Sequence, residues 1–267
     1  MIDLRSHILH GTPCGPPSFA DSLEMCRAAV AGGVRTIVAT PRWEDGSVEP
    51  PLPFAECRRR AESLESEMRG SLSVRLGFAL QFSADLPGLA ARHGAKLALG
   101  GGRHLLVSLP SVEVPSDAER VWEALARGGF SVVLAHPECN TLLRRDASRL
   151  TRWVSEGVTL QIDAASVTGA HGREVKRFAV ECLHKYEGRV AVASNVRRGA
   201  EQRSCLGRAR DVLAEAVGAG RAETLVAGTP AALIGDGVGR KDARGASTHG
   251  LGSLFRAFSP IKALTGD

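Results

Sequence analysis

Short apolar runs alternate with longer amphipathic stretches along most of this chain. The runs are rich in Val, Ile, Leu and Ala and are too short for buried helices, so they predict buried strands. The predicted strands span residues 2–7, 36–39, 73–82, 104–109, 131–135, 158–162 and 190–193. The amphipathic stretches predict helices at residues 18–32, 54–69, 86–93, 117–127, 142–155, 173–185, 201–217 and 222–227.

This alternation of strands and helices predicts the fold class. Seven strands, each followed by a helix, are typical of a parallel sheet, and this number predicts a closed or nearly closed barrel. We therefore expect an α/β protein with a distorted (β/α)7 TIM-like barrel. In such barrels the chemistry lies where the strands end, at the face that we call the mouth.

The first predicted strand ends in a polar segment. Asp3, Arg5 and His7 alternate with the apolar Ile2 and Leu4, so they share one side if the strand stays extended. Such a strand would bring polar side chains to the mouth and form the first wall of an active site.

The composition is that of an ordinary globular protein, with 43% hydrophobic residues and a net charge of +5. Arginine supplies most of the positive charge, and no basic run is interleaved with aromatic residues, so we expect no nucleic-acid partner. No apolar stretch reaches the roughly 18 residues of a membrane span, and the N-terminus lacks a signal-peptide pattern. Six cysteines without C-x-x-C spacing indicate free thiols, and we expect a cytoplasmic protein.

The end of the chain differs in composition from the rest. It is rich in Gly, Arg, Lys, Asp and Ser, and a short apolar patch follows at residues 254–264. We therefore expect a barrel domain at residues 1–235 and a flexible C-terminal tail at residues 236–267. The apolar patch is either a docking segment or a frayed end.

Several motifs match those of a known family, in the same order. They are Ile2-Asp3, Ser6-His7-Ile8-Leu9, Gly15-Pro16, Ser22-Leu23-Glu24-Met25, Thr36-Ile37-Val38-Ala39-Thr40-Pro41, Leu105-Leu106-Val107, Leu109-Pro110, Ala135-His136-Pro137-Glu138 and Leu160-Gln161-Ile162-Asp163-Ala164. On these motifs the chain resembles the PHP superfamily, specifically the bacterial tyrosine-protein phosphatases of capsule and exopolysaccharide operons (CpsB/YwqE type). The resemblance implies a PHP-type barrel. It also implies a cluster of divalent metals (manganese, iron, zinc or magnesium), usually three, that binds phosphotyrosine and activates a hydroxide.

The chain departs from the family pattern at most metal-binding positions. The replacements there are Arg5, Pro13, Cys14, Arg42, Ala79, Ser108, Asn195 and Arg197. Of the family ligands compared, only His7 and His136 remain as candidate metal ligands. Two neutral imidazoles beside fixed guanidinium charges do not suit a multinuclear cluster, so we expect no metal cofactor.

No catalytic nucleophile is assigned from the sequence. Cys139 stands where the family has an arginine, and Arg145 follows six residues later. The loop between them lacks the glycines with which a cysteine phosphatase surrounds a phosphate.

Arginines at the strand ends predict an anion site instead of a metal site. Arg5, Arg42 and Arg197 would place positive charge in the mouth, and Arg203 corresponds loosely to a substrate-binding arginine of the family. Guanidinium groups bind phosphate or carboxylate without metal. The alternative is that they pair with neighbouring carboxylates, for which the candidates are Asp3, Glu138 and Asp163.

These residues favour a phosphatase homologue with impaired hydrolysis, a pseudophosphatase that binds a phosphorylated or anionic ligand in exopolysaccharide or capsule regulation. The resemblance implies a phosphotyrosine protein, or the tyrosine kinase of polysaccharide synthesis, as its partner. Two alternatives stay open, namely an active metal-dependent protein-tyrosine phosphatase with a rearranged metal site and a non-catalytic scaffold. An oligomer also stays open.

Overall fold

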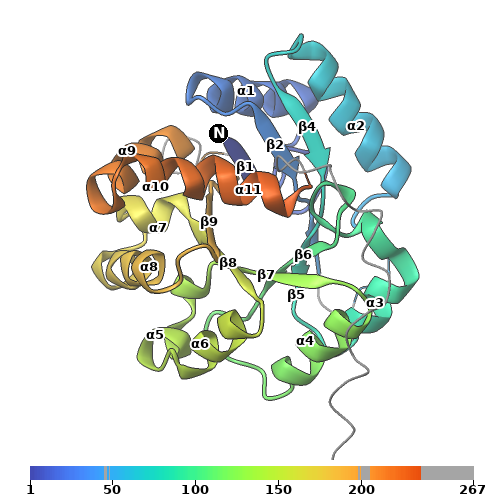
Figure 1. The fold of residues 1–267 in the computed structure, drawn as a ribbon. Coiled ribbons are helices and arrows are strands. Elements are labelled where there is room, and N and C mark those ends of the chain that lie inside the picture. Colours follow the sequence, from blue (N-terminus) through green and yellow to red (C-terminus); the bar gives the residue numbers. More distant parts are fainter. Residues whose placement is uncertain (45–46, 48, 198, 200–204, 236–267) are drawn as a thin grey trace, which may run out of the picture. The chain divides into compact units, whose positions relative to one another are not determined.

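Parallel strands surrounded by helices form the centre of the described chain (Figure 1). The computed structural model describes residues 1–235 except 45–46, 48, 198 and 200–204. The strands are β1 (Ile2–Ser6), β2 (Thr36–Ala39), β3 (Arg42–Trp43), β4 (Ser73–Leu76), β5 (Ala79–Gln81), β6 (His104–Ser108), β7 (Ser131–Ala135), β8 (Thr159–Asp163) and β9 (Val190–Ala193). They form two sheets with the orders β1-β2-β4 and β3-β5-β6-β7-β8-β9, and all neighbouring strands are parallel.

Helices follow most of the strands, as the alternation predicts. They are α1 (Phe19–Ala31), α2 (Phe54–Glu67), α3 (Leu86–His93), α4 (Ala118–Arg127), α5 (Thr141–Arg145), α6 (Ser148–Ser155), α7 (Ala164–Thr168), α8 (Arg173–Lys185), α9 (Leu206–Val217), α10 (Ala219–Glu223) and α11 (Thr229–Leu233). Short turns of 3-10 or π helix lie at Gly94–Lys96, Leu99–Gly101, Pro137–Cys139 and Thr224–Gly228. Apolar side chains of the helices and of the outward strand faces pack into one large buried cluster.

Two strand positions bend and pass from one sheet to the other. The stretch 73–82, predicted as one strand, forms β4 and β5 with two residues between them, and β2 is separated from β3 in the same way. Gly77 N donates to Ala39 O (3.1 Å) and Ala79 N donates to Pro41 O (3.2 Å), so hydrogen bonding continues past the bend.

Strands β1 and β9 close the ring. His7 N donates to Val196 O (3.0 Å), and Asn195 N donates to Arg5 O (2.9 Å). If β2 with β3 and β4 with β5 are each counted as one position, the nine described strands give the seven strand positions that the sequence predicts. The predicted α/β barrel of the TIM type is therefore confirmed.

A separate apolar cluster fills the inside of the ring. Its members from the strands alternate with residues that face the helices, as they do in a barrel. They are Leu4, Val38, Ala79, Leu106, Val133, Ala135, Ala191 and Ala193, joined by Leu99, Leu233 and Ile234. His104 Nδ1, at the start of β6, lies 2.8 Å from Leu233 O, so α11 covers the N-terminal ends of the strands.

The remaining differences from the predicted elements are local. The helix predicted at 142–155 divides into α5 and α6, and β3 and α7 were not predicted. In the described residues, the helix predicted at 201–217 begins at Leu206. The predicted tail, 236–267, lies outside the described residues. None of the described helices is long and apolar enough to cross a membrane.

Candidate functional site

The polar segment of β1 does not keep its side chains on one face. The register of β1 against β2 shifts between Asp3 and Ser6, so Asp3 and Arg5 have different neighbours. Asp3 is buried and accepts hydrogen bonds from Ser194 N (2.9 Å) and Ser194 Oγ (2.5 Å). Burial outweighs these hydrogen bonds and raises the pKa of Asp3 to about 6. Asp3 therefore ties β1 to the segment after β9, next to a cavity of about 370 Å³ that α1 also lines.

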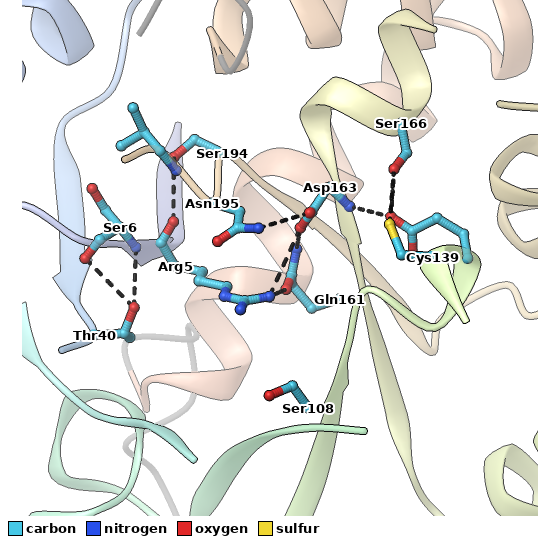
Figure 2. Close-up of polar contacts among 12 residues, drawn as sticks. Arg5, Ser6, Thr40, Ser108, Cys139, Gln161, Asp163, Ser166, Ser194 and Asn195 are labelled. Carbon is cyan, nitrogen blue, oxygen red and sulfur yellow. Dashed lines mark hydrogen bonds and ion pairs between the residues drawn. The ribbon is translucent and has the colours of Figure 1, made fainter. Parts of the chain in front are cut away.

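Arg5 lies buried at the centre of the site, pointing toward Gln161 and Asp163 (Figure 2). Its Nη1 is 3.4 Å from Gln161 Oε1 and 4.0 Å from Asp163 Oδ1. Its Nε has no hydrogen-bond partner among the described residues. A guanidinium keeps its charge inside a protein, so the barrel holds a fixed positive charge that is only partly paired.

Asp163, at the C-terminal end of β8, partly neutralises the positive charge of Arg5. Its Oδ1 accepts a hydrogen bond from Gln161 Nε2 (2.9 Å), and its Oδ2 accepts one from Asn195 Nδ2 (2.8 Å) (Figure 2). Burial alone would raise the pKa of this carboxyl, but His136, Arg5 and the two amide donors together hold it below its usual range. Asp163 is thus an anion at neutral pH.

The two retained histidines are neutral. His7 is buried, and neither of its ring nitrogens has a hydrogen-bond partner among the described residues. Burial, and then the charges of Arg5 and Arg197, lower the pKa of His7 to about 3. His136 follows β7 in a left-handed backbone conformation (φ 39°), and burial and Arg5 lower its pKa to about 4.

The other predicted arginines have different surroundings. Arg197 is exposed and close enough to Arg5 and to both histidines to lower their pKa values. Arg42, in β3, is half-buried, and its Nε lies 3.8 Å from the carboxylate of Glu44, which is not among the three carboxylates expected from the sequence. Arg203 lies outside the described residues. Two of the arginines thus meet carboxylates, at distances of 3.8 and 4.0 Å.

A second polar cluster lies beside Asp163, on the turn after β7. Glu138 is buried, and its Oε1 accepts hydrogen bonds from Asp163 N (2.8 Å) and Ser166 Oγ (2.7 Å). Burial, and then Asp163, raise the pKa of Glu138 to about 8. Cys139 Sγ lies 3.9 Å from Ser166 Oγ and 3.7 Å from His171 Nδ1. Burial, and then Glu138, raise the pKa of Cys139 to about 12, so without a bound cation it is a thiol rather than a nucleophilic thiolate.

The possible metal ligands converge at a place that the sequence did not single out. Among the residues that the structure describes, one group of three His, Cys, Asp or Glu side chains has its ligand atoms within 4.8 Å of one another. Its members are Cys139, Asp163 and His171, and neither His7 nor His136 belongs to it.

Sequence reasoning missed His171 because this residue stands in a loop, between α7 and α8, rather than at a strand end. The available signal was its position in Thr168-Gly169-Ala170-His171-Gly172, which follows the motif at the end of β8 after one short helix, α7. Gly169 and Gly172 have φ values of 90° and 96°, which turn this loop back toward the mouth.

Comparison with known proteins agrees with the barrel and its strand-end motifs. A family model described as "Capsular polysaccharide synthesis, CpsB/CapC" matches residues 1–235. The tyrosine-protein phosphatase YwqE of Bacillus subtilis is 34% identical over 188 residues, which cover 68% of this chain and 72% of that protein. The tyrosine-protein phosphatase CpsB of Streptococcus pneumoniae is 25% identical over 243 residues, which cover 88% of this chain and 99% of that protein.

Solved structures extend the comparison. One described as YwqE from Bacillus subtilis and CpsB from Streptococcus pneumoniae, unique metal-dependent tyrosine phosphatases, matches with a TM-score of 0.79 and 29% identity, covering 89% of this chain and 95% of that one. A phosphotriesterase homology protein from Escherichia coli, with a TM-score of 0.55, 13% identity and coverage of 87% and 98%, shares the fold alone. This chain belongs to the CpsB/CapC family of capsular polysaccharide synthesis, as a homologue of its metal-dependent tyrosine phosphatases.

Proposed function

We propose that this chain is a catalytically impaired homologue of the tyrosine phosphatases, which binds a phosphorylated or anionic ligand and acts in capsule or exopolysaccharide regulation. The observation that carries the proposal is the buried guanidinium of Arg5, 4.0 Å from Asp163 at the mouth. It stands where the resemblance implies the first histidine ligand of the metal cluster.

The residues around Arg5 do not fit a multinuclear metal cluster. Such a cluster needs several anionic ligands, because bridging carboxylates offset the repulsion between cations. Here Asp3 is turned toward Ser194, and Glu138 accepts hydrogen bonds from Asp163 N and Ser166 Oγ. A fixed positive charge at Arg5 would also add to the repulsion among the several cations of such a cluster. These features support weak or absent metal-dependent hydrolysis.

The charge of the same region suits an anion. The Nε of Arg5 is buried and has no hydrogen-bond partner among the described residues, and Arg197 is exposed, where it can reach a ligand in solvent. Arginine is the side chain that best matches the oxygens of a phosphate, because its donors form a planar fork. We include Arg42 and Arg203 in the proposed site as the sequence predicts them, and a phosphotyrosine protein or a tyrosine kinase of polysaccharide synthesis as the partner.

The test combines phosphate binding with hydrolysis on the purified full chain. We expect inorganic phosphate to bind in the presence of a chelator, at least about tenfold more weakly in Arg197→Ala and in Arg42→Ala. Arg127→Ala, on the exposed outer side of α4, is the matched control and should bind as the unchanged protein does. We expect little or no release of phosphate from a phosphotyrosine peptide with added manganese, iron, zinc or magnesium.

The alternatives predict different results. Rapid metal-dependent turnover that is lost in His136→Ala would refute the proposal and support an active phosphatase with a rearranged metal site. The absence of both turnover and phosphate binding would also refute the proposal, and would support the non-catalytic scaffold.

A further inference from the structure

Cys139, Asp163 and His171 come together from three segments of the chain. Cys139 lies on the turn after β7, Asp163 ends β8, and His171 lies in the loop before α8. Their ligand atoms are within 4.8 Å of one another. A zinc–sulfur bond of about 2.3 Å and a zinc–nitrogen bond of about 2.05 Å, at a tetrahedral angle, put sulfur and nitrogen about 3.5 Å apart. The 3.7 Å between Cys139 Sγ and His171 Nδ1 is close to that separation.

Each of the three groups can give an electron pair to a cation. Each Asp163 oxygen accepts one hydrogen bond from a side-chain amide, so each keeps a further lone pair. His171 is exposed, so the group has a path to solvent through its own loop. Its Nδ1 lies 3.1 Å from Ser166 Oγ, and that hydroxyl already donates to Glu138 Oε1.

The chemistry of the three donors selects the kind of cation. A thiolate, an imidazole and a carboxylate together suit zinc or cobalt(II), whereas magnesium and calcium prefer oxygen alone. The charges of the thiolate and the carboxylate balance those of one divalent cation, which limits its repulsion by Arg5, 4.0 Å from Asp163. A coordinated metal also deprotonates a thiol that would otherwise stay protonated.

A separate observation at the same place points to a missing hydrogen-bond partner. Glu138 precedes Cys139 in the chain and is fully buried, yet its Oε2 has no hydrogen-bond partner among the described residues. Three protein ligands leave the fourth position of a tetrahedral metal open to water. A water in this cluster would give the Glu138 oxygen a hydrogen-bond partner.

The geometry points to a mononuclear site for zinc or a cation of similar softness, held by Cys139, Asp163 and His171. This site is distinct from the metal cluster that the family resemblance implies, because it uses neither His7 nor His136. It holds one cation, with its fourth position open to water. It does not depend on the proposed anion binding, since none of its ligands is an arginine.

Cobalt(II) is the probe that tests the site, because thiolate ligation gives a charge-transfer band in the near ultraviolet. Titration of the metal-free full chain should give one cobalt per chain with this band, and one equivalent of zinc should remove it. In Cys139→Ser the band should vanish, and both Cys139→Ser and His171→Ala should bind zinc at least about tenfold more weakly in a competition with a chromophoric chelator.

Cys205→Ser and His184→Ala are matched controls, because they remove a cysteine and an exposed histidine outside the group. Both should bind zinc as the unchanged protein does. The inference is overturned if cobalt gives no thiolate band, which would leave an S–H···N hydrogen bond between Cys139 and His171. It is equally overturned if His171→Ala binds zinc normally, or if His7→Ala or His136→Ala abolishes binding while Cys139→Ser does not. Phosphate binding in chelator is unaffected by all these outcomes, so the proposed function is judged separately.

Discussion

Replacing Asp3 by asparagine should reduce the dependence of folding stability on pH. The Asp3→Asn side chain has nearly the same shape, and its Oδ1 can still accept a hydrogen bond from Ser194 N (2.9 Å in the native contact). Its amide can donate to Ser194 Oγ, because a hydroxyl can accept as well as donate. The substitution therefore removes the titration of residue 3 while largely keeping the contact that joins β1 to the end of β9.

The size of the effect follows from the pKa of Asp3, which burial raises from 3.8 to about 6. Between these values the folded state binds more protons than the unfolded state, so stability falls as pH rises, by up to about 1.4 kcal/mol per pH unit. The whole difference amounts to roughly 3 kcal/mol, of which about 1.4 kcal/mol falls between pH 5 and 7.5. The free energy of unfolding of Asp3→Asn, relative to that of the unchanged protein, should thus be higher at pH 7.5 than at pH 5 by about 1.4 kcal/mol.

Urea denaturation at the two pH values measures this double difference, with the fluorescence of the buried Trp43, Trp122 and Trp153 as the signal. Asp146→Asn is the matched control. The backbone hydrogen bond from Ser148 lowers the pKa of Asp146, so that residue is ionised in both states at pH 5 and above. If Asp3→Asn shows no larger change with pH than Asp146→Asn, the reasoning about the buried carboxyl is wrong.

Two further predictions concern the helical layer. Gly207→Ala should lower the free energy of unfolding by about 1–3 kcal/mol, because a Cβ there would lie 2.4 Å from a backbone oxygen. Gly220→Ala is the control, since a Cβ there would lie in open space, and it should be neutral or slightly stabilising in the same urea titration. Glu119 accepts hydrogen bonds from Arg149 Nη2 (2.6 Å) and Trp153 Nε1 (2.9 Å), and the Arg149 bond first of all lowers its pKa to about 2. Glu119→Gln should therefore cost about 1 kcal/mol near pH 7. This cost should shrink as pH falls from about 4 toward 2, because the carboxyl of the unfolded chain takes up a proton there while the folded chain keeps Glu119 ionised. Equal costs at pH 7 and at about pH 3 would contradict this account.

The strands were predictable because burial on both faces leaves a local record of short apolar runs. β6, β7 and β9 lie within one residue of their predicted bounds. The break between β4 and β5 was not predicted: it falls at Gly77, where a distant segment packs so closely that a Cβ would lie 3.1 Å from Leu99 Cα. The division between α5 and α6 did leave a signal, since Asp146 Oδ1 accepts a hydrogen bond from Ser148 N (2.9 Å) and starts the second helix.

The candidate site was predictable only in part, because the local sequence does not record its contacts with distant segments. The strand-end rule placed Arg5, His7 and His136 at the mouth, and all three share electrostatic contacts there. The rule could not foresee the register shift that turns Asp3 toward Ser194, because a bulge depends on the pairing partner. Nor could it bring in His171, which reaches the site through the backbone turns of a loop.

Asp163 links the proposed anion site to the proposed cation site. Its carboxylate lies 4.0 Å from Arg5 and within 4.8 Å of the ligand atoms of Cys139 and His171. A bound cation would draw on the negative charge that now offsets Arg5, and Arg5 would then attract an anion more strongly. Because such coupling is reciprocal, zinc should tighten anion binding by the same factor by which the anion tightens zinc binding.

Sulfate measures this coupling without precipitating zinc, and a factor of about 5 or more is expected from a coupling of about 1 kcal/mol. The control is Cys139→Ser, which leaves every arginine in place. In that variant sulfate should bind with the affinity of the metal-free protein, whether or not zinc is present. If zinc leaves the sulfate affinity of the unchanged protein as it was, the charge of Asp163 is not shared between the two sites. Arg5 would then be neutralised by its surroundings in a way that the 4.0 Å contact does not represent.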